Sequence, residues 1–257
     1  MEVAVPEKRE GSMQIKADAK IEASIEVISN ALKQPPCKIL VVGCGAGHEA
    51  GSLARAFRAK TIGIDLGDQY SFDHQGASPA VLKVMDAQKM SFPDASFDLV
   101  FSFHELEHIS DPRRALSEMV RVLRDTGTYF IGTPNKSRLL GYIGSATSLR
   151  NKVMWNLHDL SKRARGKWSN EAGAHAGFTR EELLRLCTTA FGEGRDATDA
   201  YYRALYAKRH GALDVLVKSG AATFVYPCAY VVGKKAVSSA MLEERFASAS
   251  AIGQSAT

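Results

Sequence analysis

A glycine-rich turn, Gly43-Cys44-Gly45-Ala46-Gly47, follows a short apolar segment of this 257-residue chain. Glycines let a backbone turn sharply and approach a ligand closely, and a helix that starts there offers free N–H groups. Asp65 stands 22 residues after Gly43, at the end of the next apolar segment. A carboxylate at that place can accept hydrogen bonds from two ribose hydroxyls, so the pattern predicts a site for a ligand that carries an adenosine.

The spacing of the glycines distinguishes two adenosine cofactors. The dinucleotide fingerprint G-x-G-x-x-G requires a glycine at position 48, where this chain has His48. The pattern G-x-G-x-G favours a ligand without a pyrophosphate over NAD. Asp86-Ala87 follows a third apolar segment, where a carboxylate can accept a hydrogen bond from the exocyclic amine of adenine. A plain strand–helix turn, with Asp65 and Asp86 as local caps, is the alternative without a ligand.

The elements that would position these residues alternate between apolar strands and amphipathic helices. Alternation at this spacing predicts an α/β fold, a doubly wound Rossmann-like seven-stranded sheet, with ligands bound at the carboxyl ends of its strands. Thr179 and Glu182 form the sequence pattern of a capping box. Strands are predicted at 38–43, 61–65, 81–86, 97–103 and 128–133, with closing strands near 197–206 and 224–234; helices are predicted at 17–33, 49–57, 111–123 and 177–191.

Between Lys136 and Lys167 the chain has eight basic residues and one acidic residue, whereas the whole chain has a net charge of only +5. Apolar residues from Leu149 to Leu160 recur at helical spacing, which predicts a helical cap inserted after strand five, above the pocket. The predicted organisation is an N-terminal helical segment (1–36), a cofactor-binding Rossmann-like core (37–135), a basic helical cap (136–176), the C-terminal part of the core (177–236) and a flexible tail (237–257).

Composition excludes several classes of protein. Apolar residues make up 45% and charged residues 24% of the chain, which is ordinary for a globular protein and argues against extensive disorder. The four cysteines have no metal-ligand spacing, and nothing near the first residue resembles a signal peptide. A cytoplasmic protein is therefore expected.

Several segments together resemble the class I S-adenosylmethionine (SAM) methyltransferases, and most closely the small-molecule branch typified by ubiquinone/menaquinone-biosynthesis-like enzymes. They are KILVVGCGAG, Asp65, Asp86-Ala87, MSFPDASFDLVFSFHELEHISDPRRALSEMVRVLRDTGTYFIGTPN and HAGFTREELLRL, covering residues 38–135 and 175–186. The resemblance implies that the glycine loop wraps the methionine part of SAM, Asp65 the ribose and Asp86 the adenine edge. The cofactor-binding residues are predicted to be Gly43, Cys44, Gly45, Gly47, Asp65, Leu66, Asp86, Ala87 and Phe103. One departure is Val41, where an acidic residue is common in the family.

Two histidines are the candidates for the chemistry. Methyl transfer depends mainly on proximity, and a base is needed only where the acceptor carries a proton at the working pH. His104 is the first candidate and His175 the second. No metal is predicted; His104, Glu107 and His108 are weak candidate ligands, and a structural role for them is the stronger alternative.

The resemblance implies a SAM-dependent methyltransferase that acts on O, C or N of a small organic acceptor, anionic or lipid-like, and releases S-adenosylhomocysteine (SAH). The basic cap is interpreted as a solvated helix face, a site for an acidic substrate or a peripheral contact with a membrane. No nucleic acid is expected as a partner, because no recognition module accompanies the basic residues. The alternatives are an RNA- or protein-modifying methyltransferase, an NAD-dependent oxidoreductase and a SAM-binding protein without turnover.

Overall fold

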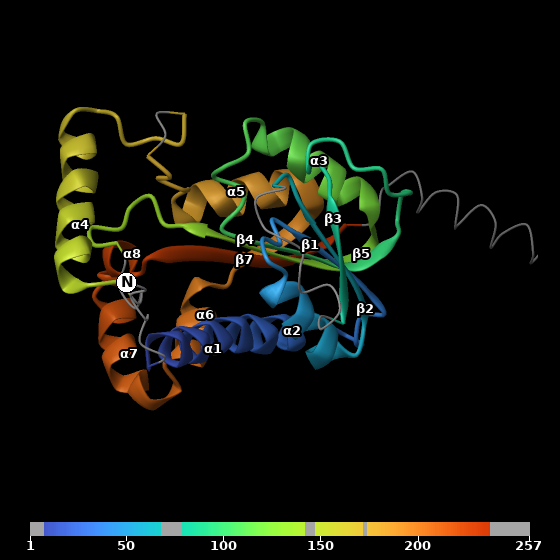
Figure 1. Cartoon of the computed structure of the whole chain (residues 1–257), viewed down its shortest axis with the longest axis horizontal. Helices are drawn as coiled ribbons and strands as arrows, with labels where there is room; N and C mark the ends of the chain where they lie inside the picture. Colours follow the sequence, from blue (N-terminus) through green and yellow to red (C-terminus); the bar gives the residue numbers. More distant parts are fainter. Residues whose placement is uncertain (1–7, 68–78, 142–146, 172–173, 237–257) are drawn as a thin grey trace, which may run out of the picture.

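A computed structural model describes residues 8–67, 79–141, 147–171 and 174–236, with side chains from residue 19 onward. Seven strands form one sheet in the order β3-β2-β1-β4-β5-β7-β6, and helices cover both of its faces (Figure 1). The predicted α/β, doubly wound, seven-stranded fold is confirmed. The predicted tail, 237–257, lies outside the described residues. No helix among the described residues has the length and apolar character that crossing a bilayer requires.

All strands of the sheet run in the same direction except β7, the last strand along the chain. β1 pairs in parallel with β2 and β4, whereas β7 runs antiparallel to both β5 and β6. The strands are β1 (Lys38–Val42), β2 (Lys60–Asp65), β3 (Ala80–Val84), β4 (Phe97–Phe103), β5 (Leu123–Pro134), β6 (Gly192–Asp196) and β7 (Cys228–Lys235). The helices are α1 (Lys8–Ala31), α2 (His48–Phe57), α3 (Pro112–Val122), α4 (Leu149–Ala164), α5 (Arg180–Phe191), α6 (Thr198–Leu205), α7 (His210–Lys218) and α8 (Ala222–Val225), with a 3₁₀ turn η1 (Ala207–Arg209).

Two hydrophobic cores lie on the two faces of the sheet. One contains buried residues of α1, α2 and α6, and the other contains those of α3 and α5. β1 has four buried residues in succession because both of its faces are covered, which explains its uninterrupted apolar sequence. The capping box predicted at the start of α5 is present, with Thr179 accepting from the N–H of Glu182 and Glu182 accepting from that of Thr179.

The prediction of a strand near 197–206 was wrong. Residues 198–205 form helix α6, which buries Thr198, Tyr201 and Tyr202 on one side. Their 3-1 spacing places all three on one face of a helix, although tyrosine by itself is common in strands. The sixth strand is instead Gly192–Asp196, an exposed edge strand without an apolar pattern. At 224–234 the prediction was right for β7, but the segment begins in the short helix α8.

Helix α4 lies within the segment predicted to be a cap, and it stands at one end of the long axis of the molecule (Figure 1). Its placement above the pocket is not confirmed, because residues of α4 line neither of the two cavities at the carboxyl ends of the strands. Arg138, from the same basic segment, is buried and donates to the carbonyls of Asn135 and Ala176. Part of the predicted basic patch therefore serves the packing of the fold.

Candidate functional site

A cavity of about 630 Å³ opens where the parallel strands end, which we call the carboxyl edge of the sheet. This volume lies within the range of small-molecule and cofactor sites. Residues from the ends of β1, β2, β3 and β4 surround it, as the doubly wound topology requires. The lining residues are Val42, Gly43, Gly45, Ile64, Asp65, Leu66, Met85, Asp86, Ala87, Gln88, His104, Glu105, His108, Ile109 and Ser110.

The glycine loop forms one wall of this cavity. Gly43 and Gly45 have φ angles of 74° and 46°, in the region that favours glycine. A Cβ on Gly45 would meet no atom within 4 Å, so this residue faces open space. A Cβ on Gly43 would lie 2.5 Å from the side chain of Glu105. The loop thus needs glycine for its turn and, at Gly43, for the approach of a neighbouring carboxylate.

Two of the predicted loop residues lie away from the cavity. Cys44 is buried, and its side chain packs where a Cβ on Gly63 would be. Burial raises the pKa of the Cys44 thiol to about 12, so this cysteine is not a nucleophile at neutral pH. Gly47 caps α2 with a φ of 85° and lies against Leu82. These two residues shape the loop, and a direct contact with a ligand stays a prediction.

The two predicted aspartates line the cavity in orientations that leave lone pairs for a ligand. Asp65 accepts hydrogen bonds from the N–H groups of Gly45 (2.9 Å) and Gly67 (3.1 Å), so its carboxylate also fixes the glycine loop. Asp86 accepts from the backbone and the side-chain amide of Gln88, and both of these bonds use the same oxygen, Oδ1. Leu66 and Ala87, also predicted, line the cavity beside them.

Glu105 is a cavity residue that the sequence did not single out. Burial, and then the negative charges of Asp65 and Glu107, raise its pKa to about 7. The described residues that line the cavity include no Lys or Arg, and the two ring nitrogens of His104 face Cys228 and Glu107 rather than Glu105. Val41, which is buried in the core, stands where an acidic residue is common in the resembled family. The absence of that acidic residue was the clue in the sequence that another carboxylate supplies the charge. The resulting negative cavity suits a ligand with cationic groups, such as a sulfonium and an α-ammonium.

A second, more apolar cavity of about 240 Å³ shares His104 with the first. Phe103, predicted as a cofactor-binding residue, lines this second cavity and not the first. Cys228, at the start of β7, closes one side. Aromatic side chains supply much of the remaining wall: Tyr201, Tyr202, Tyr206 and Tyr230, with Ala19, Lys20, Leu205 and Pro227 between them.

His104 and Cys228 form a pair at the junction of the two cavities. The Nε2 atom of His104 is 3.3 Å from Sγ of Cys228. Burial by itself lowers the pKa of His104, but the Cys228 sulfur and the Glu107 carboxylate outweigh it and raise the pKa to about 10. Burial raises the pKa of the Cys228 thiol, but His104 outweighs this and lowers it. The pair therefore favours an imidazolium beside a thiolate.

Glu107 and His108 connect His104 to His175, the second predicted histidine. Its Oε1 lies 3.6 Å from Nδ1 of His104 and 3.8 Å from Nε2 of His108. The His108 ring in turn lies 4.6 Å, centre to centre, from that of His175. The structure thus brings His104 and His175 into one array of titratable groups. Among the described residues no set of three or more His, Cys, Asp or Glu converges as metal ligands do, so His104, Glu107 and His108 do not form such a set.

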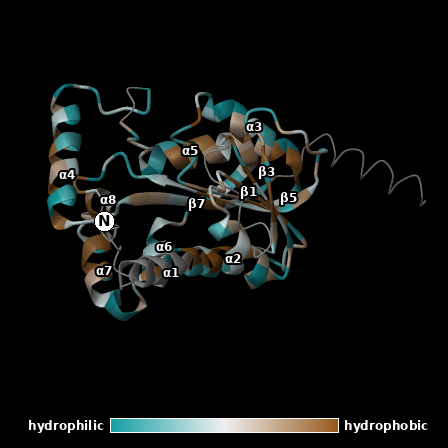
Figure 2. Ribbon diagram, in the orientation of Figure 1, coloured by the Kyte–Doolittle hydropathy of each residue, from teal (hydrophilic) through white to brown (hydrophobic). Residues whose placement is uncertain are grey.

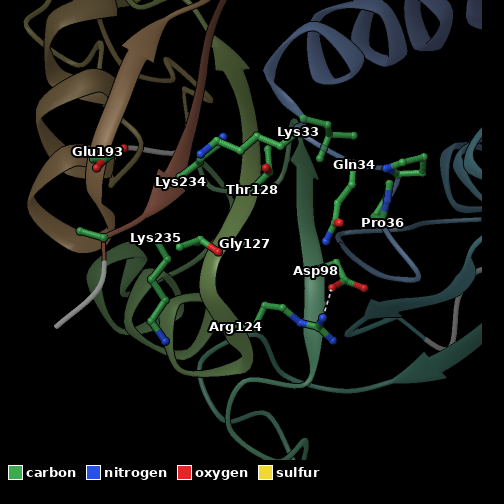
Figure 3. A pocket seen from close by; sticks show the side chains of 14 residues that line it. Lys33, Gln34, Pro36, Asp98, Arg124, Gly127, Thr128, Glu193, Lys234 and Lys235 are labelled. Atoms are coloured by element: carbon green, nitrogen blue, oxygen red, sulfur yellow. Dashed lines mark ion pairs between the residues drawn. The ribbon is translucent and has the colours of Figure 1, made fainter. Parts of the chain in front are cut away.

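A third cavity, of about 420 Å³, lies at the opposite, amino edge of the sheet, where the parallel strands begin (Figure 3). Asp98 points into it and accepts from the N–H groups of Cys37 and Lys38. Figure 3 shows its ion pair with Arg124, which has an N–O distance of 2.6 Å. Asp98 thus connects the starts of the three strands β1, β4 and β5. Its position at the start of a strand indicates the same structural role.

Comparisons with known proteins identify the kind of domain. Residues 40–131 match the sequence profile of a family described as "Methyltransferase domain". A probable SAM-dependent methyltransferase of Mycolicibacterium smegmatis is 36% identical over 100 residues, which are 38% of this chain and 38% of that protein. A tocopherol O-methyltransferase of Arabidopsis thaliana is 31% identical over 145 residues, which are 48% of this chain and 40% of that protein. The alignments span less than half the length of these two relatives.

Solved structures show the same fold. A plantazolicin methyltransferase, solved in complex with SAH and a monoazolic desmethylPZN analogue, has a TM-score of 0.58 and 15% sequence identity, and the match covers 90% of this chain and 87% of that one. At this identity the likeness concerns the fold alone. The sequence match, however, includes the glycine loop and every residue that lines the larger cavity. Residues 40–131 of this chain thus match a methyltransferase domain, within a fold shared with a solved methyltransferase.

Proposed function

We propose that this chain binds SAM in the cavity of about 630 Å³ and transfers its methyl group to a small organic acceptor in the adjoining aromatic cavity. One observation carries the proposal. All residues that line the larger cavity fall between Val42 and Ser110, inside the region that matches the methyltransferase domain. When bound, SAM supplies an electrophilic methyl group on a cationic sulfur.

Three carboxylates would hold the cofactor. Asp65 accepts hydrogen bonds from the ribose hydroxyls, using the lone pairs that are not bonded to the N–H of Gly45. The second oxygen of Asp86, Oδ2, accepts a hydrogen bond from the adenine amine. Glu105, beside Gly43, attracts the α-ammonium of the methionine part and takes over the charge that Val41 does not supply. Gly45 gives the methionine backbone room to approach the loop.

The aromatic cavity favours a flat, largely apolar acceptor. Stacked rings provide flat contact area, as in the pair of Tyr201 and Tyr230, whose centres lie 3.8 Å apart. Lys20 adds a cation to the wall, which suits an acceptor with an acidic group such as a phenol. The proposal therefore narrows the predicted class of acceptors to aromatic or conjugated molecules and leaves O-, C- and N-methylation open.

An acceptor of this kind has a proton to lose. When the acceptor atom forms its new bond to carbon, the carbon–sulfur bond breaks and the electron pair stays on sulfur, so a base must take the acceptor's proton. Because the Cys228 sulfur and Glu107 raise the pKa of His104, and His104 lowers that of Cys228, the sulfur of Cys228 is the atom of the pair that would accept it. His104 stabilises the thiolate and, with Glu107 behind it, keeps its ring directed at the sulfur.

Calorimetric titration of the full chain with SAH, with NAD as the control, tests the cofactor. We expect SAH to bind in the micromolar range and NAD to give no binding heat. The same protein with SAM and a set of phenolic and quinol acceptors should then release SAH in an acceptor-dependent manner. Binding of NAD alone would overturn the assignment of the cofactor. Tight binding of SAH without turnover on any aromatic acceptor would contradict the assignment of the aromatic cavity.

A further inference from the structure

Helix α4 is attached to the rest of the molecule through polar side chains. Asn156 accepts a hydrogen bond from the N–H of Gly141 at 2.7 Å, and Arg163 donates to the carbonyl of Lys136. Asp159, which is buried, faces Arg138, also buried, at 3.9 Å. These anchors recur at a spacing of three and four residues, so they form one stripe along the helix.

A second stripe on the same helix is apolar and faces solvent. We call Leu149, Val153, Leu157 and Leu160 the α4 stripe; their exposed fractions are 78%, 51%, 60% and 62%. They also recur at a spacing of three and four residues, so they share one face. A helix on the surface of a globular protein normally buries its apolar face and exposes its polar one. In α4 the arrangement is reversed, which indicates that the apolar face has a partner outside this fold.

The apolar surface continues beyond α4. Leu139 and Leu140, in the segment between β5 and α4, are 69% and 57% exposed. The N–H of Leu139 donates to the carbonyl of Phe224 in α8, where Phe224 and Val225 are exposed as well. Figure 1 shows α4, α7 and α8 together at one end of the molecule, and Figure 2 colours much of α7 there as hydrophobic. Exposed apolar area gathered in this way marks a binding surface.

Cations accompany this apolar end. Between Lys136 and Lys167 the only acidic residue is Asp159, which is buried against Arg138. Asp214 of α7 is paired with Arg203 at 2.5 Å. Exposed basic side chains occur on α4 and the turn after it, and on η1 and α7: Arg150, Arg165, Lys167, Lys208, Arg209 and Lys218. A partner for this end therefore needs both an apolar phase and negative charge.

We propose that the end formed by the α4 stripe, Leu139, Leu140 and α8 docks on an anionic lipid bilayer. Interfacial helices combine an apolar face, which enters the acyl boundary, with cations that contact anionic headgroups. A second copy of the chain offers apolar surface, but its charge at this end is of the same sign. A nucleic acid offers phosphates but no apolar phase for leucines. The bilayer is the partner that satisfies both the stripe and its cations.

Docking at this end would bring the aromatic cavity close to the membrane. Tyr206 and Pro227 line that cavity; Tyr206 directly precedes η1, and Pro227 follows α8 after one intervening residue. An apolar acceptor could then enter from the lipid without crossing water. This consequence rests on the proposed function, whereas the docking itself does not.

Sedimentation of the full chain with vesicles tests the docking. We expect the protein to bind vesicles that contain phosphatidylglycerol far more strongly than vesicles of phosphatidylcholine alone, and to be released by salt. The double variant Leu157→Ser/Leu160→Ser should lower the partition coefficient by about tenfold or more, because its apolar contact is lost. The matched control, Val81→Ser/Val84→Ser, removes two side chains that are each 58% exposed on β3 and should bind as the original chain does.

Three results would overturn the proposal. The first is unchanged vesicle binding in the α4 variant when circular dichroism shows that it is folded. The second is an equal loss in the β3 control. The third, seen by analytical ultracentrifugation without lipid, is a dimer that Leu157→Ser/Leu160→Ser abolishes while neither vesicle binds; this would assign the surface to a second copy of the chain. Because none of these readouts uses SAM or an acceptor, failure here is distinct from failure of the proposed function.

Discussion

The two edges of the sheet use their acidic residues differently. At the amino edge, Asp98 is paired with Arg124 and Asp125 with Lys235, at 2.6 and 3.3 Å. At the carboxyl edge, Asp65 and Asp86 accept from backbone N–H groups. Glu105 has no Lys or Arg beside it on the described wall of the cavity.

The difference separates charges that hold the fold together from charges that await a ligand. At the amino edge each of these two acidic side chains has a basic partner within the protein, so its charge is neutralised without a ligand. At the carboxyl edge, burial and then the negative charges of Asp65 and Glu107 disfavour the carboxylate of Glu105, so its pKa rises to about 7. The carboxyl edge can therefore bind a cationic cofactor by relieving a charge that the fold leaves unpaired.

The largest effect is expected from Gly43→Val. The substitution places a side chain at a positive φ and within 2.5 Å of Glu105, so the glycine loop must shift. We expect SAH affinity to fall by about a hundredfold or more in calorimetric titration. Gly211→Ala is the matched control, since a Cβ there meets no atom within 4 Å. If Gly43→Val binds SAH normally, the loop is not the wall of the cofactor site.

The contrast between the edges is sharpest for Asp65→Ala and Asp98→Ala. Loss of Asp65 removes the predicted ribose acceptor, so SAH affinity should fall by about tenfold to a hundredfold. Loss of Asp98 leaves two N–H groups and Arg124 without their partner, so the free energy of unfolding should fall by about 2 kcal/mol, with SAH affinity unchanged. Calorimetry and urea denaturation measure the two quantities. The opposite pattern would remove the distinction between the edges.

The His104–Cys228 pair extends the comparison to the start of β7. We expect the pH midpoint for alkylation of Cys228 by iodoacetamide to lie below that of an ordinary thiol, because His104 lowers the pKa of Cys228. In His104→Gln the midpoint should move up by about one unit or more. Mass spectrometry follows both Cys228 and the exposed Cys37, which serves as the internal control. Equal midpoints for the two thiols would contradict the imidazolium–thiolate pair.

The smallest effect is expected from Glu105→Gln. A carboxyl group whose pKa is raised from 4.5 to about 7 holds its proton more tightly in the folded state. The stability that this contributes is complete below pH 4.5 and is lost as pH rises through about 7. The variant should remove this loss, on the order of 1 kcal/mol, in thermal denaturation without ligand. The control is the exposed Glu26→Gln.

With ligand, Glu105→Gln should act in the other direction. Above pH 7 the carboxylate of Glu105 attracts the α-ammonium of SAH, so the variant should bind SAH several-fold more weakly there. A variant that binds SAH equally well at every pH would show that another group compensates the ammonium.

Local spacing made the cofactor side of the site predictable. The glycine turn and the aspartates at the ends of β2 and β3 are short patterns next to apolar strands, and in a parallel sheet such strand ends meet at one edge. The fold was predictable for the same reason, except for the outermost strand β6 and the helix α6 that follows it. The exposed strand β6 has no apolar pattern, and the tyrosines of α6 resemble a strand until their 3-1 spacing is considered.

What depends on distant pairs could not be predicted. Cys228 meets His104 across 124 positions of the chain, and no spacing rule connects them. Glu105 gains its role from Gly43, in the loop that follows the neighbouring strand β1, because the missing side chain leaves room for the carboxylate. For α4, periodicity predicted an apolar face correctly but not what covers it. The polar side chains that turn this face to solvent bind the backbone of residues 136–141. The periodicity of the helix does not reveal these contacts.

The antiparallel strand β7 has a consequence for synthesis on the ribosome. It lies between β5 and β6, so β6 has its ladder of hydrogen bonds only with β7, and β5 loses one of its two neighbours without it. A nascent chain that has emerged up to Asp196 can assemble the five parallel strands but leaves β5 as an open edge and β6 unpaired. Between that moment and the emergence of Lys235, a chaperone or a neighbouring nascent chain can reach β5, so this interval is when misassembly is most to be expected.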